Sequence, residues 1–242
     1  MSGRKRFFIQ SVNYPAQTSV ILDGEEFVHA KTVQRVEAGT EIILLDGSGK
    51  EYSAIVAKVE KHSLTANIVG CADGDKEPKE DIYLLCGALK GDKTELVVQK
   101  ATELGVSRIG VFSSAYCSAF INANKLERLN KVAREAAKQC MRSRAPEVIY
   151  YDGFASALAS AKNYKNKLFA CEFADKSQTD IMGVNGSTAL VVGSEGGFSE
   201  EEFALSARYG FAGITLGKRI LRAETAAVSL TALVAYALGE LR

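Results

Sequence analysis

Short apolar runs separated by turn-forming residues make up the pattern of residues 1–72, as is typical of β-strands. A turn signal, Asp46-Gly47-Ser48-Gly49, ends one of these runs, and residues 25–34 have the spacing of a short helix. The predicted strands are 7–9, 19–22, 41–45, 52–59 and 64–69. Several short strands this close together along the chain predict a small β-barrel.

The pattern changes after residues 73–81, a charged segment that contains glycine and proline and no apolar side chain. Beyond it, continuous apolar runs typical of buried parallel strands alternate with segments of helical period. The predicted strands are 82–85, 109–112, 148–151, 167–170, 188–192 and 214–216, and the predicted helices are 92–104, 124–140, 155–161, 199–209 and 224–241. This alternation predicts an α/β domain with a mostly parallel sheet. We therefore expect two domains, a β-rich one over residues 1–72 and an α/β one over residues 73–242.

The amino-acid composition mainly excludes classes of protein. Hydrophobic residues make up 47% of the chain and charged residues 24%, which is ordinary for a globular protein. No apolar run approaches the roughly 18 residues that a bilayer span requires. Residues 4–6 are basic, but the apolar run after them is far shorter than the about 7–15 residues of a secretory signal. We therefore expect a soluble, cytoplasmic protein without a membrane partner.

Cysteine and histidine usage limits the chemistry further. Five cysteines, an odd number at scattered positions, argue against a disulfide framework. The chain has no C-x-x-C pair and only two histidines, His29 and His62, so we expect no metal site. A hydrolase of the Ser-His-Asp or Cys-His type would depend on one of those two imidazoles.

Charge is unevenly distributed, although 30 basic and 29 acidic residues give a net charge of only +1. Residues 125–144 carry seven basic and two acidic side chains, a local excess of +5. At about 100° per residue, the apolar positions of this predicted helix fall on one side. The basic positions fall on the other side: Arg128, Lys131, Arg134, Lys138 and Arg142, with Arg144 just beyond. Such a face can contact phosphate groups, but a solvated face has the same pattern, so both interpretations stay open.

A glycine-rich segment, Gly193-Ser194-Glu195-Gly196-Gly197-Phe198, follows directly on a predicted buried strand. Glycine allows a ligand to approach the backbone closely, and ligands of α/β sheets bind at the carboxyl ends of strands. The segment is neither a Walker loop nor a G-x-G-x-x-G motif. It is followed by Ser199-Glu200-Glu201-Glu202, a capping box that predicts a helix start. A nucleotide-like ligand held by backbone groups is one interpretation, and an ordinary glycine-rich turn is the other.

A second segment, residues 216–227, also lies between a predicted strand and a predicted helix. Its apolar residues Ile220 and Leu221 could wall a flat ligand, and Arg222 begins the helix beside them. Routine surface charges at a helix start, including Lys218 and Arg219, are the simpler interpretation.

Together these segments resemble the ribosomal small-subunit methyltransferase E family of the knotted SPOUT superfamily, which methylates N3 of a uridine in 16S ribosomal RNA. The resemblance covers essentially the whole chain. Its most specific parts are residues 193–199 and 216–227, and its supporting parts are 90–93, 99–106 and 134–139. The family usually has proline where Ser194 stands and glycine where Met141 stands.

The resemblance implies a PUA-like β-barrel that holds RNA, followed by a SPOUT methyltransferase domain with a C-terminal trefoil knot. The implied cofactor is S-adenosylmethionine, and the implied partner is 16S ribosomal RNA or the small ribosomal subunit. Such enzymes act as homodimers through the last helix. The sequence allows this, because Leu230, Leu233, Val234, Ala237 and Leu241 form an apolar stripe on that helix.

The resemblance also suggests roles for residues. Arg222 would stabilise charge that develops on the uracil ring, and Glu195 would act as a base or orient the cofactor, unless it only caps a turn. Cofactor contacts are expected from Glu172, Val192, Gly193, Glu195, Gly196, Gly197, Leu216, Gly217, Ile220, Leu221, Thr225 and Ala226. Phosphate contacts are expected from Arg4, Arg6, Arg128, Lys131, Arg134, Lys138, Arg142 and Arg144.

Two other functions remain as alternatives. A non-catalytic RNA-binding or ribosome-assembly factor could retain the same fold and would bind S-adenosylmethionine without transferring its methyl group. An α/β enzyme that acts on a small nucleotide is the second alternative, although it would have no use for the β-rich domain and the basic helix.

Overall fold

The computed structural model describes residues 4–171 and 180–241. These residues form two separate β-sheets, one in each of two units. One unit consists of residues 1–77 and 137–145, and the other of residues 78–136 and 146–242. The chain passes from Glu77 to Pro78 within the charged 73–81 segment.

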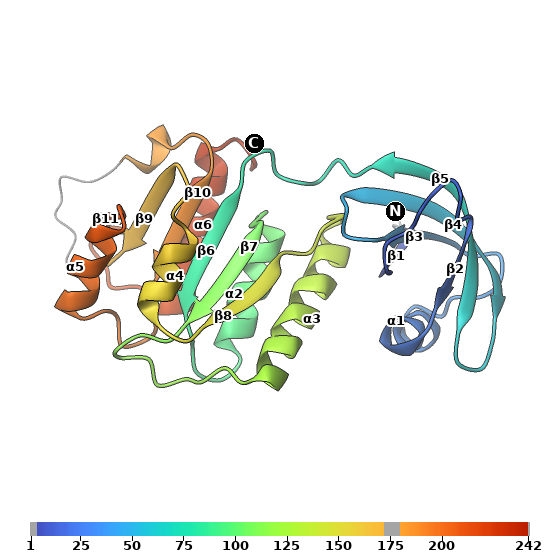
Figure 1. Cartoon of the computed structure of the whole chain (residues 1–242), viewed down its shortest axis with the longest axis horizontal. Coiled ribbons are helices and arrows are strands. Elements are labelled where there is room, and N and C mark those ends of the chain that lie inside the picture. The colour runs from blue at the N-terminus through green and yellow to red at the C-terminus, as the bar shows by residue number, and fades with distance from the viewer. Residues whose placement is uncertain (1–3, 172–179, 242) are drawn as a thin grey trace. The chain divides into compact units, whose positions relative to one another are not determined.

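The first unit contains a five-stranded sheet with the strand order β1-β3-β4-β5-β2 (Figure 1). The strands are β1 (Lys5–Phe8), β2 (Ser19–Leu22), β3 (Glu41–Leu45), β4 (Lys50–Val59) and β5 (Leu64–Asp73). The sheet is open, with β1 and β2 at its edges, so the predicted barrel is a half-barrel. Alternate strand residues, such as Phe7 and Leu64, share one hydrophobic core with Phe27 of α1 (Gly24–Val28). Helix α1 continues into a π-helical turn, η1 (His29–Val33).

The second unit contains a six-stranded sheet with the order β11-β9-β10-β6-β7-β8. All of its strand pairs are parallel, which confirms the predicted α/β architecture. The strands are β6 (Ile82–Gly87), β7 (Arg108–Phe112), β8 (Glu147–Tyr151), β9 (Asn166–Ala170), β10 (Thr188–Val192) and β11 (Ala212–Ile214).

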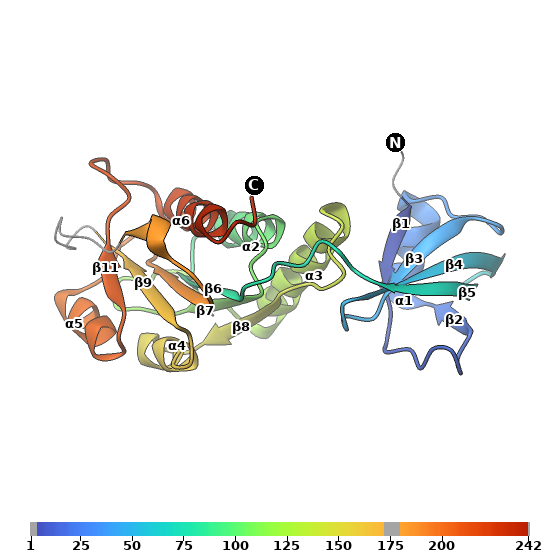
Figure 2. The same cartoon turned by 90° about the horizontal axis from the view of Figure 1, so that it is seen from above.

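Helices cover both faces of this sheet, as Figure 2 shows, with α2, α3 and α6 on one side and α4 and α5 on the other. The helices are α2 (Lys93–Glu103), α3 (Ala123–Gln139), α4 (Phe154–Ser160), α5 (Glu200–Arg208) and α6 (Ala223–Ala237), with a short 3-10 turn, η2 (Ile181–Gly183). Successive side chains of a strand point to opposite faces. Ile82 and Leu84 therefore pack in the core under α2 and α6, whereas Tyr83 and Leu85 pack in the core under α4. Within the described ranges, no helix combines the length and the apolar character needed to cross a membrane.

Helix ends follow local rules in some places and depart from them in others. Ser199 and Glu202 form the predicted capping box of α5. Asp92 stands at the N-cap of α2, but its side chain makes no capping hydrogen bond. The last helix is shorter than predicted, because Gly239, with φ of +85°, ends it after Ala237. Met141, just beyond α3, has φ of +67°. That conformation favours glycine, the residue usual at this position in the family that the sequence resembles.

Candidate functional site

A cavity of about 620 Å³ lies at the carboxyl ends of β9, β10 and β11. Its walls come from the two segments singled out in the sequence, residues 192–198 and 214–223, together with Lys93, Ala170, Cys171 and Ala226. Strands of a parallel sheet end at the same edge, and this is why segments about 20 residues apart meet around one space. The volume is in the range of small-molecule sites, about 300–1,000 Å³.

Ten of the twelve residues predicted to contact a cofactor line this cavity: Val192, Gly193, Glu195, Gly196, Gly197, Leu216, Gly217, Ile220, Leu221 and Ala226. Thr225 is exposed and is not among the lining residues. Glu172 lies outside the described residues.

The glycine-rich segment owes its shape to neighbours within the fold. Gly197 has φ of +70°, and a Cβ on Gly193 would lie 2.9 Å from the ring of Phe198. A Cβ on Gly196 would lie 2.6 Å from the Cβ of Tyr116 and 2.7 Å from its carbonyl oxygen. Gly196 lines the cavity as predicted, and the lack of a side chain there also makes room for the loop that carries Tyr116.

Beside the cavity, Lys93 lies between two carboxylates. Its Nζ is 3.4 Å from Oε1 of Glu195 and 3.6 Å from Oε2 of Glu224. Glu195 also accepts a hydrogen bond from the backbone N–H of Lys90, at 3.1 Å. Burial by itself would raise the pKa of Glu195, but the Lys90 N–H and the Lys93 ammonium lower it below its usual value. The carboxylate of Glu195 is thus a weak base and a well-anchored hydrogen-bond acceptor.

Lys93 was missed in the sequence, where it resembles any cation in the first turn of a helix. It lies 102 residues before Glu195, so no local pattern connects the two side chains. In the sequence Glu224 is only the first residue of the last predicted helix, 224–241. Its Oε2 is buried, and within the described part of the chain it accepts no hydrogen bond.

The rim of the cavity is positively charged. Lys218, Arg219 and Arg222 line it, and all three residues are exposed. Within the described ranges none of the three forms a hydrogen bond or an ion pair through its side chain. Between them Ile220 is 92% exposed, an unusual environment for an isoleucine. These side chains are therefore available to a ligand at the cavity.

The predicted phosphate contacts divide into two groups. Three of them are buried in ion pairs of the first unit: Arg6 pairs with Glu51, Lys138 with Glu26, and Arg142 with Glu77. Their side chains are only 8%, 6% and 4% exposed. The expectation that these three cations face solvent is wrong, because each has a carboxylate partner from a distant segment.

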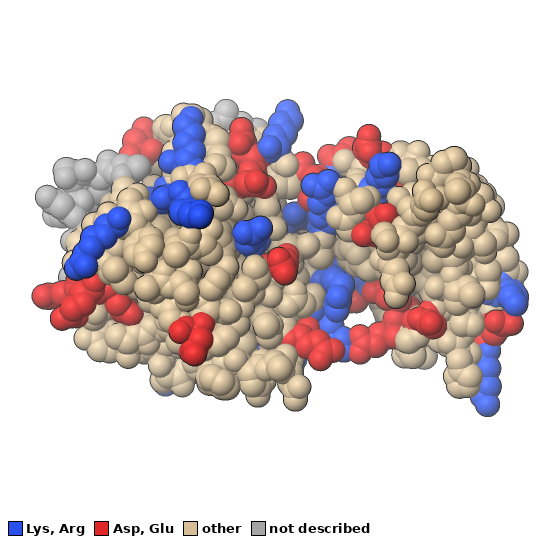
Figure 3. Space-filling model, viewed as in Figure 1, with Lys and Arg blue, Asp and Glu red and all other residues tan. Residues whose placement is uncertain are grey.

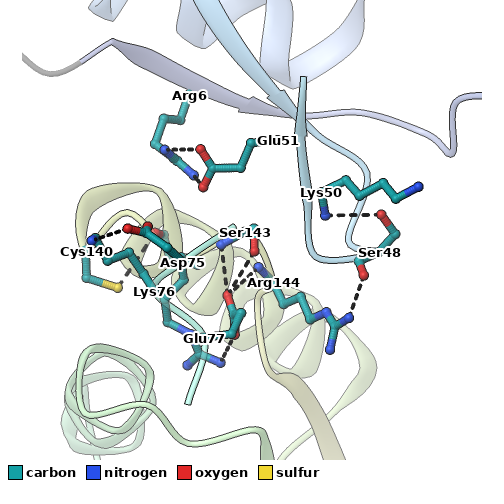
Figure 4. A network of polar contacts seen from close by, with 12 residues as sticks. Arg6, Ser48, Lys50, Glu51, Asp75, Lys76, Glu77, Cys140, Ser143 and Arg144 are labelled. Atoms are coloured by element: carbon teal, nitrogen blue, oxygen red, sulfur yellow. Dashed lines mark hydrogen bonds and ion pairs between the residues drawn. The ribbon is translucent and has the colours of Figure 1, made fainter. Parts of the chain in front are cut away.

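Glu77 is the centre of one of these clusters. Its Oε2 lies 2.9 Å from Nη2 of Arg142, and its Oε1 accepts hydrogen bonds from the backbone N–H groups of Ser143 and Arg144, each at 2.9 Å. Figure 4 shows Glu77 pointing toward Ser143 and Arg144, with Arg6 and Glu51 paired nearby. In the sequence Glu77 is one of several charges in the 73–81 segment, and nothing there marks it as buried.

The other predicted phosphate contacts are more accessible. Arg134 is exposed, and Arg128 is 63% exposed although it pairs with Glu95. Arg4 is 56% exposed and pairs with Glu41. Arg144 is exposed while donating to the carbonyl of Ser48, and Lys131 is half-buried. On the face drawn in Figure 3, cations and carboxylates are interspersed rather than gathered into one basic patch.

Comparison with known proteins connects both units to RNA methylation. Residues 75–235 match the RNA methyltransferase domain family, and residues 22–69 match the RNA methyltransferase PUA domain family. The chain is 32% identical to ribosomal RNA small subunit methyltransferase E of Mesomycoplasma hyopneumoniae, over 93% of this chain and 96% of that protein. It is 29% identical to the Bacillus subtilis protein of the same name, over 96% of each chain.

Among solved structures, the chain is similar to a ribosomal RNA small subunit methyltransferase E from Neisseria gonorrhoeae bound to S-adenosylmethionine. The TM-score is 0.87, the sequence identity is 29%, and the similarity covers 98% of each chain. The likeness therefore extends over both units.

Proposed function

The chain belongs to the ribosomal RNA small subunit methyltransferase E family, and from this premise we propose that it methylates N3 of one uridine in 16S ribosomal RNA. It is an S-adenosylmethionine-dependent ribosomal RNA methyltransferase. The observation that carries the proposal is the cavity at the ends of β9, β10 and β11, whose walls are the two segments most specific to the family. Such an enzyme would act where ribosomes are assembled, in the cytoplasm.

The residues of the cavity fit S-adenosylmethionine. Backbone groups of residues 192–197 and 216–221 would hold the adenine and ribose, as expected for a site built on loops at strand ends. When bound, the cofactor supplies a methyl group on a positively charged sulfur. The carboxylates of Glu195 and Glu224, on either side of Lys93, are the anionic groups beside the cavity and would suit the positively charged sulfur, whereas the cations of the rim would face the RNA. The buried Oε2 of Glu224 accepts no hydrogen bond in the described chain, although the Lys93 ammonium lies 3.6 Å away, and it could accept one from a ligand.

Arg222 is the residue that we assign to charge stabilisation. N3 of uridine carries a proton, and its removal places negative charge on the ring oxygens. Arg222 lines the cavity and, in the described structure, has no carboxylate partner that would neutralise it. A guanidinium in this position can donate hydrogen bonds to a ring oxygen as the charge develops.

Glu195 is better suited to orient than to accept the proton of N3. Its lowered pKa makes the carboxylate a weak base, and Lys90 and Lys93 hold it in place. We therefore propose that Glu195, through Lys93, keeps the glycine-rich segment in the shape that receives the cofactor.

RNA phosphates would be held by the exposed cations. We propose Lys218 and Arg219 at the rim, Arg128 and Arg134 on α3, and Arg4 and Arg144 in the first unit. The PUA match supports a role of the first unit in RNA binding. Arg6, Lys138 and Arg142 are left out, because their charges are neutralised inside the first unit.

We further propose a homodimer through α6. Leu230 and Val234 of the predicted apolar stripe are buried in the core of their own unit, whereas Leu233 and Tyr236 are 42% and 45% exposed. Exposed apolar side chains on one helix are suited to bury against a second copy.

Light scattering should give a dimer for the native chain and a monomer for Leu233→Glu, because the change would bury an unpaired charge. Leu96→Glu, at an equally exposed leucine of α2, is the matched control and should stay dimeric. The trefoil knot that the resemblance implies stays a prediction.

The decisive experiment is methyl transfer from labelled S-adenosylmethionine to small-subunit RNA and to small-subunit particles, with identification of the modified nucleoside. We expect 3-methyluridine. Tight cofactor binding without transfer to any RNA would instead support a non-catalytic assembly factor. Methylation of free nucleosides would support an enzyme that acts on small nucleotides.

A further inference from the structure

The loop of residues 113–122, between β7 and α3, carries two exposed aromatic side chains. Tyr116 is 57% exposed and Phe120 is 70% exposed. The loop nevertheless has a defined position in the second unit. The backbone N–H of Ala115 donates to Oε1 of Glu202 at 2.8 Å, and the thiol of Cys117 donates to the carbonyl of Ala88 at 3.2 Å. The two rings are therefore presented by an anchored segment.

Tyr116 lies directly against the glycine-rich segment that lines the cavity. The hydroxyl of Ser194 is 3.4 Å from the carbonyl oxygen of Tyr116. A Cβ on Gly196 would lie 2.6 Å from the Cβ of Tyr116, so the tyrosine side chain begins beside a residue that lines the cavity. The ring itself is largely in solvent.

Phe120 has different surroundings. Its ring packs edge-on against Tyr150, with ring centroids 6.3 Å apart. Among the described residues no ring pair involves Tyr116. The loop thus holds one aromatic ring, Phe120, that packs against another ring of the fold, and one, Tyr116, that does not.

The reaction creates a need for such a ring. A base in a folded RNA is stacked, and it must leave its stack before an enzyme can reach its ring nitrogen. An exposed aromatic side chain restores part of the lost stacking, whichever base is presented, because every base has a π-face. A ring beside the glycine-rich wall of the cavity would do this where the base arrives.

We propose that Tyr116 is the stacking residue for the target pyrimidine, positioning the unstacked base at the entrance of the cavity. The proposal rests on the proposed RNA methylation and adds to it a residue that recognises the base. Its occupant is an unpaired pyrimidine of the RNA substrate, whose flat face matches the free ring of Tyr116.

Rate measurements on three variants test the proposal. Tyr116→Ala should lower kcat/KM for small-subunit RNA by about 10- to 100-fold, the usual effect of losing one stacking ring. Tyr116→Phe keeps the ring and should stay near the native value. Phe120→Ala removes the more exposed ring of the same loop and should also stay near the native value. Calorimetry with S-adenosylmethionine should give native affinity for all three variants.

A spectroscopic test is possible because the chain contains no tryptophan. Tyr116→Trp and Phe120→Trp each introduce a single fluorophore. RNA should quench the emission of the first variant and leave the second nearly unchanged, since a stacked base quenches indole fluorescence.

Three results would overturn the proposal: native transfer by Tyr116→Ala, an unquenched Tyr116→Trp variant in a complex with RNA, or a Tyr116→Ala protein that loses activity because it no longer forms the native oligomer. If the native protein itself transferred no methyl group to RNA, the proposed function would fail first, and the two failures are therefore distinguishable.

Discussion

The cations around the cavity and those buried in the first unit have opposite surroundings. At the cavity, Arg222 is exposed and, within the described structure, forms no ion pair. In the first unit, Lys138 and Arg142 are almost completely buried, each against a glutamate. The difference teaches that a basic residue in the sequence is available to a ligand only where the fold leaves it exposed and does not enclose it against a carboxylate.

The same contrast exists within the basic segment, residues 125–144. Arg128 and Arg134 keep exposed side chains, whereas Lys138 and Arg142, one to two turns further along, are enclosed. An isolated buried charge is costly, so folding encloses such a residue only together with an opposite charge. The local excess of +5 therefore overstates the charge that RNA could meet.

The largest effect is expected from breaking an enclosed pair. Arg142→Leu would leave the carboxylate of Glu77 mostly buried without its guanidinium, and should lower the free energy of unfolding by about 3–5 kcal/mol. Urea unfolding measures this, with Arg134→Leu as the exposed control, expected within about 0.5 kcal/mol of the native chain. Equal stabilities of the two variants would show that the enclosed Arg142 contributes no more to stability than the exposed Arg134.

The available cation at the cavity should matter for rate and not for stability. Arg222→Ala is expected to lower single-turnover methyl transfer by about 10²–10³, as is usual when one charge-stabilising donor is lost. Affinity for S-adenosylmethionine, measured by calorimetry, should stay near native. Arg219→Ala, on the same rim, is the control and should affect RNA affinity more than the rate of transfer. A native rate for Arg222→Ala would show that Arg222 does not stabilise the charge that develops during methyl transfer.

A smaller effect is expected on α3. The double change Arg128→Ala with Arg134→Ala should weaken RNA binding and reduce the slope of log K against log salt by about 1–2, since each lost phosphate contact removes about 0.7–0.9. Lys138→Met should leave that slope unchanged, because its charge already pairs with Glu26. Filter binding across a salt series measures both slopes. A smaller slope for Lys138→Met would show that Lys138 contacts RNA phosphates after all.

The smallest effect concerns pH. The pKa of Glu195 is lowered, so this carboxylate is already ionised well below neutral pH and cannot titrate in the usual assay range. The pH–rate profiles of the native chain and of Glu195→Gln should therefore have the same shape between about pH 6 and 9, even if their amplitudes differ. A limb of the native profile that disappears in Glu195→Gln would make Glu195 the base.

Local patterns predicted most elements of the fold. The strand 188–192 and the capping box at Ser199 and Glu202 have the predicted bounds, because burial periodicity and capping depend on neighbours in sequence. The family resemblance also predicted that the two segments share a site, and the carboxyl ends of parallel strands do meet at one edge of the sheet. The last helix was predicted to end at 241, because Leu241 continues its apolar pattern, but α6 ends at Ala237. The positive φ of Gly239 ends the helix before that pattern does.

The sequence by itself therefore determined the two kinds of sheet, the order of strands and helices, and the glycine-rich walls of the cavity. Only the tertiary structure decided which charges are free, because Lys138 meets Glu26 across 112 residues and Arg142 meets Glu77 across 65. It also decided that Gly196 makes room for Tyr116. Ser194, two residues before Gly196, donates a hydrogen bond to the carbonyl of Tyr116 across 78 residues of sequence. Electrostatic pairing and close packing depend on distance in space, and a linear pattern contains no information about that distance.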